Sequence, residues 1–381
     1  MSAEAASPHV VLVNLALVPG LRAGELLARL PGLGRFAASL AEAGARVSVV
    51  ARSHEDADLT VGGVRLVTVR DGAGPFAPLR SPARRIVARV RELGPDVVHL
   101  GGFLFPVPTA TLRAALPRRV PLVLQHHGEP PGSGRLGFLQ RLLLRTADAV
   151  LVTSRLIVDE WVRGGYLAPE THVEEVLEAS TDLRPVDRAA ARAATGIDGD
   201  PAILWVGRLH PRKDPVNALR AFEAALERLP RARLHLVYRE APLLTELKEL
   251  CARNPALARA VRFVGEVPHE ELPAWYSGAD LFLTSSPSEG SNWALIEATA
   301  CGLPAACSDI PANRRVATPG SSFFAPGEPP QGADALVRAS HATAPRGEAI
   351  REHFERRLSW SVVAREAVGA YTRAIARRGG R

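Results

Sequence analysis

Short runs of aliphatic residues alternate with amphipathic stretches along the first half of the chain. The strand-like runs lie at residues 9–17, 46–52, 64–69, 96–100, 121–125 and 149–153, and a helical pattern links the first two. Strands that alternate with helices predict a parallel sheet. The run VVLVNLALV is apolar on both alternating sets of positions, which indicates a central strand covered by helices on both faces.

The second half repeats this pattern after an interruption. The stretch STDLRPVDRAAARAATGIDGDP, rich in turn residues, breaks the alternation near 180–200. New strand-like runs follow at residues 202–207, 233–238, 261–265, 281–286 and 304–308, with helical patterns between them at 215–229, 243–253, 270–277 and 293–301. The sequence therefore predicts two doubly wound α/β domains, residues 1–185 and 186–360, and a ligand cleft between the carboxyl ends of their sheets.

Length and composition fit two folded domains. A chain of 381 residues exceeds the roughly 250–300 residues at which single cores stop growing. Hydrophobic residues make up 46% and charged residues 23%, the range of ordinary globular proteins. Neither a run of about 18 apolar residues nor a basic and apolar leader is visible, so we expect a cytoplasmic protein. The three cysteines, at 251, 301 and 307, are expected to be reduced thiols, because their number and spacing suit neither a disulfide framework nor a zinc site.

The basic net charge does not change the expectation of two ordinary globular domains. The net charge is +7, and of the 47 basic residues all but Lys213 and Lys248 are arginine. These arginines are scattered along the chain, without the interleaved aromatic residues of nucleic-acid-binding surfaces. We therefore expect no nucleic-acid partner, whereas a basic face could contact a phosphorylated acceptor or a membrane surface.

The segment GRLHPRKDP is the first candidate for chemistry. The strand that begins at residue 202 ends at Gly207, and Asp214 with Pro215 supplies an N-cap and a first-turn proline for the next helix. Arg208 and Lys213 flank this turn and could converge on one anion, for which a diphosphate is the natural candidate. Two solvated surface charges are the alternative interpretation.

The segment SSPSEGSNWALIEATACGLP is the second candidate. Ser291 or Asn292 is expected to cap a short helix over 293–301, and Gly290 lets the backbone approach a ligand at the helix N-terminus. Glu289 and Glu297 are eight residues apart, about 12 Å at a helical rise of 1.5 Å per residue, whereas paired glycosidase carboxylates lie about 5–9.5 Å apart. Two binding carboxylates are favoured over a hydrolytic pair.

The run EGSNWALIEATACGLP resembles the signature of retaining family 4 glycosyltransferases, which have the GT-B fold, and the resemblance covers roughly residues 200–375. It implies that Glu289 contacts the donor sugar, that Glu297 contacts the ribose and that Arg208 with Lys213 clamps the diphosphate. Backbone amides of 291–293 would also hold the diphosphate, and the nucleobase would lie against 265–267. The implied donor-binding positions are Gly207, Arg208, Lys213, Gly265, Val267, Glu289, Gly290, Ser291, Asn292, Trp293 and Glu297.

The first half matches the family more loosely. His127, in QHHGEPP at a strand end, fits the family pattern better than His126, and its carbonyl would face the anomeric carbon; His99 is expected to be structural. The family's glycine pair is out of its usual register, so Gly32 and Gly34 are only weak candidates for acceptor contacts. The turn after residue 238 lacks the family's glycines, which bears on donor preference. The resemblance also implies that a C-terminal helix at 361–381 packs onto the first domain.

The expected function is retaining transfer of a hexose from a nucleotide diphosphate sugar, UDP favoured over GDP, to a hydroxyl of a small-molecule acceptor. His127, Arg208, Lys213 and Glu289 are the candidate catalytic residues, and neither a metal nor a further cofactor is expected beside the nucleotide-sugar co-substrate. The alternatives are transfer to a lipid or cell-envelope precursor at a membrane, nucleotide-sugar epimerisation, and a non-catalytic partner of another glycosyltransferase. The oligomeric state is not predicted.

Overall fold

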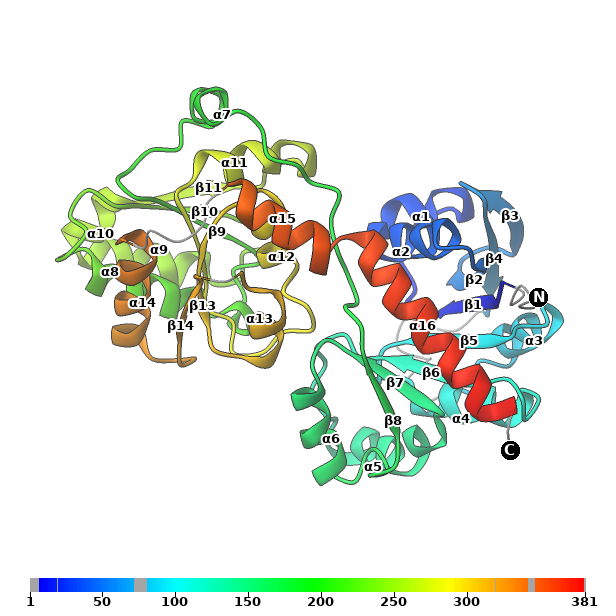
Figure 1. The fold of residues 1–381 in the computed structure, drawn as a ribbon. Coiled ribbons are helices and arrows are strands. Elements are labelled where there is room, and N and C mark those ends of the chain that lie inside the picture. Colours follow the sequence, from blue (N-terminus) through cyan, green and yellow to red (C-terminus); the bar gives the residue numbers. More distant parts are fainter. Residues whose placement is uncertain (1–6, 19, 72–80, 319, 342–346, 380–381) are drawn as a thin grey trace. The chain divides into compact units, whose positions relative to one another are not determined.

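The computed structural model describes residues 7–18, 20–71, 81–318, 320–341 and 347–379. The chain divides into two compact units, one formed by Met1–Ala179 with Trp360–Arg381 and the other by Ser180–Ser359. Each unit is a parallel sheet covered by helices on both faces (Figure 1). The division falls six residues before the boundary expected from the sequence.

The N-terminal unit has an eight-stranded sheet in the order β3-β4-β2-β1-β5-β6-β7-β8. The strands are β1 His9–Asn14, β2 Arg46–Ser53, β3 Ala57–Val61, β4 Val64–Arg70, β5 Val97–Gly101, β6 Leu122–Gln125, β7 Ala149–Val152 and β8 His172–Glu175. Its helices include α1 Leu26–Arg29, α2 Pro31–Glu42, α3 Arg84–Glu92, α4 Pro106–Ala115, α5 Gly134–Leu143 and α6 Val158–Arg163. All strand pairs are parallel except β3 with β4, and β1 is central, as its apolar sequence predicts.

The last helix of the chain, α16 (Trp360–Gly379), belongs to this N-terminal unit. It runs beside the N-terminal sheet in Figure 1, and its buried face includes Tyr371. The Tyr371 hydroxyl forms a 2.5 Å hydrogen bond with Nδ1 of His99 on β5. Burial lowers the pKa of His99 to about 3, so this histidine is neutral and structural, as the sequence suggested. Residues 380 and 381 lie outside the described part of the chain.

The C-terminal unit has a six-stranded parallel sheet in the order β11-β10-β9-β12-β13-β14. The strands are β9 Ala202–Val206, β10 Arg233–Val237, β11 Val261–Gly265, β12 Leu281–Thr284, β13 Ala305–Ser308 and β14 Ser322–Phe324. Its helices are α7 Arg188–Thr195, α8 Pro215–Ala225, α9 Leu244–Arg253, α10 Pro255–Ala260, α11 Leu272–Gly278, α12 Trp293–Ala300, α13 Pro311–Val316, α14 Pro329–His341 and α15 Glu348–Arg357. The aliphatic side chains of β9, β10 and β12 fill the core between the helical layers.

Three strands were not predicted from the sequence pattern, and all three lie at the edges of the sheets. β3 and β8 carry polar, largely accessible residues, and β14 has three residues. An edge strand is only partly covered, so its sequence does not need the apolar run that marks a central strand. The interruption near 180–200 also contains a helix, α7, which packs against α11 through Arg192, whose Nε donates to the Gly278 carbonyl at 2.9 Å.

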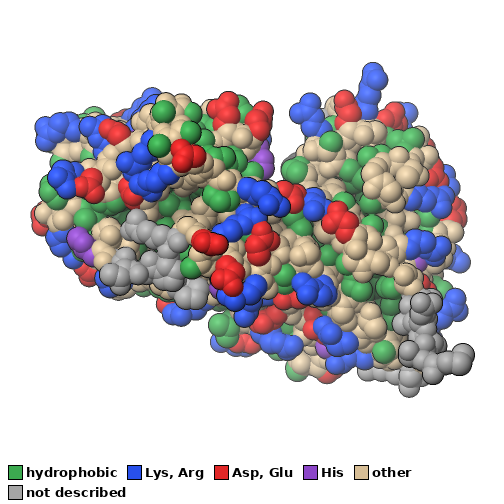
Figure 2. All heavy atoms as spheres, turned by 45° about the horizontal axis from the view of Figure 1, so that its top comes forward, with side chains coloured by type: hydrophobic (Ala, Val, Ile, Leu, Met, Phe, Trp, Pro, Cys, Tyr) green, Lys and Arg blue, Asp and Glu red, His purple; other side chains and the backbone are tan. Residues whose placement is uncertain are grey.

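The surface is mixed in charge. Figure 2 shows Lys and Arg side chains interspersed with Asp and Glu over the visible face, without one continuous basic block. Among the described residues, none of the helices combines the length and apolar character needed to span a bilayer.

Candidate functional site

The loop after β9 is built as the sequence predicts. Asp214 adopts a left-handed conformation, with φ of 46°, and its carboxylate accepts the backbone N–H of Asn217 at 3.2 Å, which caps α8. The Ser285 hydroxyl, just after β12, donates to the Asp214 carbonyl at 2.7 Å. The loop is therefore fixed at the carboxyl ends of two neighbouring strands, the edge at which doubly wound sheets bind ligands.

Lys213 and Glu289 meet at this edge. The Lys213 Nζ lies 2.5 Å from Oε1 of Glu289, and the two side chains are 23% and 11% exposed. Sequence analysis assigned them to different parts of a ligand, one to the diphosphate and one to the sugar, and did not foresee their direct ion pair. The structure thus brings together a cation from the β9 loop and a carboxylate from the β12 loop beside the start of α12.

Arg208 makes a different contact. Its Nη1 lies 3.6 Å from the carboxylate of Glu240, on the loop after β10, and both side chains are about half exposed. Exposed pairs of this kind contribute about 0–1 kcal/mol, so the guanidinium can turn to a ligand at little cost. Glu240 belongs to the turn where the sequence departs from the family pattern, and its pairing with Arg208 was missed because only the order of β9 and β10 brings them together.

The start of α12 corrects one expectation. Asn292 occupies the N-cap position with φ of 46°, yet no side-chain hydrogen bond caps the helix. Its carboxamide instead donates to Asn313 at 2.7 Å and to Thr284 at 3.2 Å. Ser291, the residue before it, is buried. The side chain of Asn292 anchors the loop to the core, because the buried Thr284 hydroxyl and Asn313 carboxamide offer it partners there, and so it does not cap the first-turn N–H groups of α12.

The carboxylate of Glu297, in the second turn of α12, is held by two residues that sequence analysis did not single out. The Tyr276 hydroxyl donates to Oε2 at 2.9 Å, and Nε2 of His269 lies 3.1 Å from Oε1. Burial first, and then the charge of Glu297, raises the pKa of Tyr276, so the phenol stays protonated. The hydrogen bond to Glu297 raises the pKa of His269. His269 and Tyr276 both lie in VPHEELPAWY, next to the segment predicted to contact the nucleobase. This position was the sequence signal that could have identified them.

The remaining candidates in this unit surround these pairs. Gly207 follows β9, and a Cβ there would lie 3.0 Å from the Trp205 ring. Gly265 ends β11 with φ of 92° and open space where a Cβ would lie, and Val267 comes two residues later. Gly290 is buried, and the exposed Trp293 donates its indole N–H to the Ser180 carbonyl at 2.6 Å. These residues lie at the end of a strand, at the start of α12 or in the loops that follow the strands, at the carboxyl end of the C-terminal sheet.

In the N-terminal unit, His127 follows β6 and is held from two sides. Its backbone N–H donates to Glu129 Oε2 at 2.7 Å, and its Nδ1 forms an ion pair with Glu178. Desolvation alone would lower the pKa of His127, but the adjacent Glu178 carboxylate outweighs it and raises that pKa. Sequence analysis missed Glu129 and Glu178. A Cβ at Gly101 would lie 3.1 Å from His127 Nε2, so this glycine leaves room for the imidazole.

His126, the neighbouring histidine, is structural. Its Nε2 lies 2.9 Å from the Glu129 carbonyl, and its ring packs edge-on against Phe103 and Trp161. Of the two glycines that were weak candidates for acceptor contacts, Gly32 lies in the first turn of α2, and Gly34 packs so closely that a Cβ would lie 2.2 Å from the Leu27 carbonyl. Close packing of α1 on α2 is enough to require a glycine at 34.

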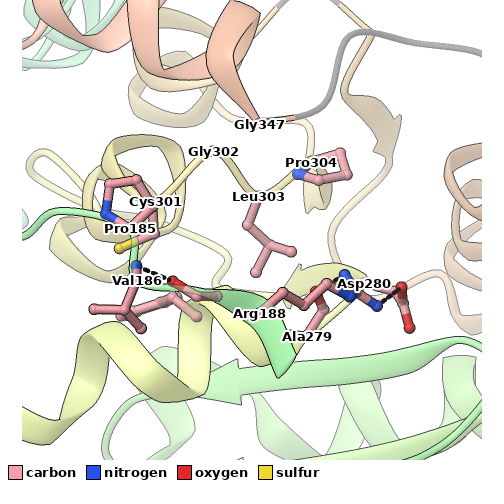
Figure 3. A pocket seen from close by; sticks show the side chains of 12 residues that line it. Pro185, Val186, Arg188, Ala279, Asp280, Cys301, Gly302, Leu303, Pro304 and Gly347 are labelled. Atoms are coloured by element: carbon pink, nitrogen blue, oxygen red, sulfur yellow. Dashed lines mark hydrogen bonds and ion pairs between the residues drawn. The ribbon is translucent and has the colours of Figure 1, made fainter. Parts of the chain in front are cut away.

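A cavity of ≈ 370 Å³ lies at the opposite end of α12 from Glu289. Figure 3 shows its lining, with Arg188 joined to Asp280 and with Cys301, Leu303 and Pro304 facing the same space. The lining is mostly apolar, and Tyr276 separates it from the carboxylate of Glu297. The candidate site is therefore the polar loop cluster at the N-terminal end of α12, where cations, carboxylates and backbone N–H groups converge.

Two glycosyltransferase family models match the chain. Residues 6–176 match "Glycosyl transferase 4-like domain", and residues 200–341 match "Glycosyl transferases group 1". D-inositol 3-phosphate glycosyltransferase 2 of Catenulispora acidiphila is 34% identical over 206 residues, 51% of this chain and 48% of that protein. The chain spans about half the length of the curated relatives that it matches first, 48% and 50%.

Solved structures match over nearly the whole chain. Sucrose-phosphate synthase from Thermosynechococcus elongatus aligns with a TM-score of 0.73 and 21% identity, over 97% of this chain and 100% of that one. Alr3699/HepE from Anabaena, in complex with UDP and glucose, aligns with a TM-score of 0.63 and 16% identity, over 96% of this chain and 100% of that one. At these identities the alignments establish the fold. The chain therefore belongs to the family 4 glycosyltransferases and is built from the two parallel-sheet α/β domains of the GT-B fold.

Proposed function

We propose that the protein transfers a hexose from a nucleotide diphosphate sugar to a hydroxyl acceptor with retention of anomeric configuration. The observation that carries this proposal is the pairing of Lys213 with Glu289 beside the start of α12. A cation and the positive end of a helix dipole suit a diphosphate, and a carboxylate next to them suits the hydroxyls of the attached sugar.

The chemistry follows from charge development on the leaving group. As the glycosidic bond to the diphosphate breaks, negative charge grows on the departing phosphate oxygen, and Lys213, Arg208 and the α12 N–H groups stabilise it. The acceptor hydroxyl attacks from the same face and gives its proton to that oxygen, so the products are the glycoside and the free nucleoside diphosphate. No protein nucleophile is needed. Glu297 accepts hydrogen bonds from the ribose.

The substrate classes are the finer part of the proposal. The Anabaena structure in complex with UDP and glucose favours UDP over GDP for the donor. The relatives named D-inositol 3-phosphate glycosyltransferase favour a small acceptor of the sugar-phosphate class. This acceptor would suit a chain with a net charge of +7, because scattered arginines attract anionic substrates.

A lipid-linked acceptor is the second candidate, and one surface feature favours it. Phe138 and Leu142 lie four residues apart on α5 and are 65% and 60% exposed. Arg135 and Arg145 flank them at exposed positions. Apolar side chains between arginines are typical of surfaces that rest on anionic lipid.

The test is a matrix of UDP- and GDP-hexoses with phosphorylated polyols, unphosphorylated polyols and lipid-linked acceptors, in which products are identified by mass and anomeric configuration by NMR. We expect an α-linked glycoside from a UDP-α-hexose and a phosphorylated polyol. Isomerised donor without acceptor would identify an epimerase. Donor binding without turnover by any acceptor would favour a non-catalytic partner, and an inverted product would reject the proposed mechanism.

A further inference from the structure

The two oxygens of Glu297 are held by partners of very different mobility. Tyr276 is fully buried, and its hydroxyl donates to Oε2 at 2.9 Å. His269 contacts Oε1 at 3.1 Å, yet its side chain is 67% exposed while that of Glu297 is only 10% exposed. One partner is therefore fixed in the core, whereas the other covers the carboxylate from the solvent side and can leave without opening a cavity.

The element that carries His269 is suited to such a movement. The short 3-10 helix His269–Glu271 follows the loop 265–267 and has no side-chain cap. Pro268, His269, Glu270 and Glu271 are all exposed. Few buried contacts hold this turn, so its rearrangement is a low-energy opening compared with movement of β11 or α12.

His269 is the side chain in this cluster whose ordinary pKa lies closest to neutral pH. Glu297 of α12 raises its pKa by hydrogen bonding and charge, and Glu270 beside it adds to this rise. At the C-cap of α12, burial and the Glu297 charge raise the pKa of Cys301 to about 12, and Arg351 opposes this rise. Tyr276 and Cys301 therefore keep their protons, and the imidazole is the side chain that responds.

Building on the proposed function, we propose that His269 occupies the ribose-binding oxygen of Glu297, so that a nucleotide sugar binds by displacing the imidazole and releasing its proton. The ribose hydroxyl then donates to Oε1 in place of Nε2, while Tyr276 keeps Oε2 and fixes the carboxylate. His269 acts on donor affinity through Glu297, which makes it a specificity-determining residue of the donor site.

The sign of the pH effect follows from linkage. In the free protein the contact with Glu297 favours the imidazolium, so protonation stabilises the form that blocks the site. Displacement returns the imidazole toward its ordinary pKa, and the proton leaves. Donor affinity should therefore rise with pH through the window in which free His269 loses its proton, and should level off above it.

Calorimetry with UDP-glucose, whose esterified diphosphate does not titrate near neutral pH, tests this linkage. Titrations in two buffers of different ionisation enthalpy, from about pH 6 to about pH 8, give both Kd and the number of protons released. For the natural protein we expect net proton release and a Kd that falls by about threefold or more across this range. The variant His269→Gln keeps a polar side chain but cannot titrate, and the matched control is His341→Gln, at the end of α14.

The outcomes separate the two proposals. A loss of proton release and of the pH dependence in His269→Gln, but not in His341→Gln, supports displacement, and tighter binding by His269→Ala near pH 6 would strengthen it. Equal proton release in the natural protein and in His269→Gln overturns this inference alone. If neither UDP-glucose nor GDP-mannose binds to any form, the proposed function fails and the inference falls with it.

Discussion

Three carboxylates, two at the candidate site and one in the N-terminal unit, have partners far away in the sequence, and these pairs decide how each residue behaves. Glu289 meets Lys213 and Glu297 meets Tyr276, while in the other unit Glu178 meets His127. A buried carboxylate needs such a partner because desolvation of an unpaired charge costs several kcal/mol. Each pair can therefore be tested by removing one member and observing the other.

The clamp residues are the first test at this scale. We expect Lys213→Ala and Arg208→Ala each to lower kcat/KM by about 10²-fold or more, because each removes a cation that stabilises the leaving diphosphate. The midpoint of thermal unfolding should change little for Arg208→Ala, whose ion pair is exposed. Arg212→Ala, on the same turn, is the matched control. Steady-state kinetics check this, and wild-type turnover by both clamp variants would rule the clamp out.

The His127 pair gives a second residue-scale test. Glu178→Gln removes the charge that raises the pKa of His127, so NMR titration of the imidazole should show a lower pKa in the variant. Since the pKa is raised in the folded protein, the pair stabilises the fold fully at low pH, and this contribution is lost as pH rises through the folded value. Glu175→Gln, on the neighbouring strand β8, is the control. An unchanged His127 titration would contradict the role of Glu178.

At the scale of elements, close backbone contacts explain why some glycines are present. α1 and α2 pack so closely that Gly34 leaves no room for a side chain, whereas Gly24 has nothing within 4 Å of a built Cβ. Close contacts also position the ends of the strands. The loops after β9 and β12 are linked by the hydrogen bond from the Ser285 hydroxyl to the Asp214 carbonyl. The elements thus set the positions at which the site residues emerge.

Gly34→Ala tests the contact between α1 and α2. A Cβ would lie 2.2 Å from the Leu27 carbonyl, so the helices must separate, and we expect a loss of about 1–3 kcal/mol in the free energy of unfolding. Gly24→Ala should change it by less than about 0.5 kcal/mol. Chemical denaturation followed by circular dichroism measures both. Equal stability of the two variants would show that the packing at Gly34 relaxes without cost.

At the scale of the whole molecule, the N-terminal unit is assembled from both ends of the chain. α16 closes the core beside β5 and α2, and Arg373 on it forms a 2.6 Å ion pair with Glu174 on β8. The C-terminal unit, Ser180–Ser359, is continuous and has its own core. A change near the C-terminus should therefore destabilise the unit that begins the chain.

Tyr371→Phe tests this prediction. It removes the hydroxyl that satisfies the buried His99 ring, at an expected cost of about 1–3 kcal/mol. Hydrogen exchange measured by mass spectrometry should then increase in peptides from β1 and β5 and stay constant in peptides from β9 and β12. Tyr238→Phe, the same substitution in the C-terminal unit, should leave β1 and β5 protected. Faster exchange in both units, or in neither, would contradict this assignment.

The sequence by itself determined the features that depend on neighbouring residues. Apolar runs fixed the central strands, Asp214 with Pro215 marked the start of α8, and EGSNWALIE identified the helix that carries the candidate site. These features are local because a buried strand needs apolar side chains on both faces and a helix end needs a cap or a free N–H group.

Only the tertiary structure decided which side chains meet. Arg208 pairs with Glu240, a contact that the sequence pattern does not show, and Asn292 turns into the core, although it was a candidate helix cap. His269 and Tyr276 reach Glu297 from more than 20 residues away. Such pairings follow from the order of strands in the sheet and from burial, and the periodicity of the sequence encodes neither the strand order nor the partner of a buried polar group.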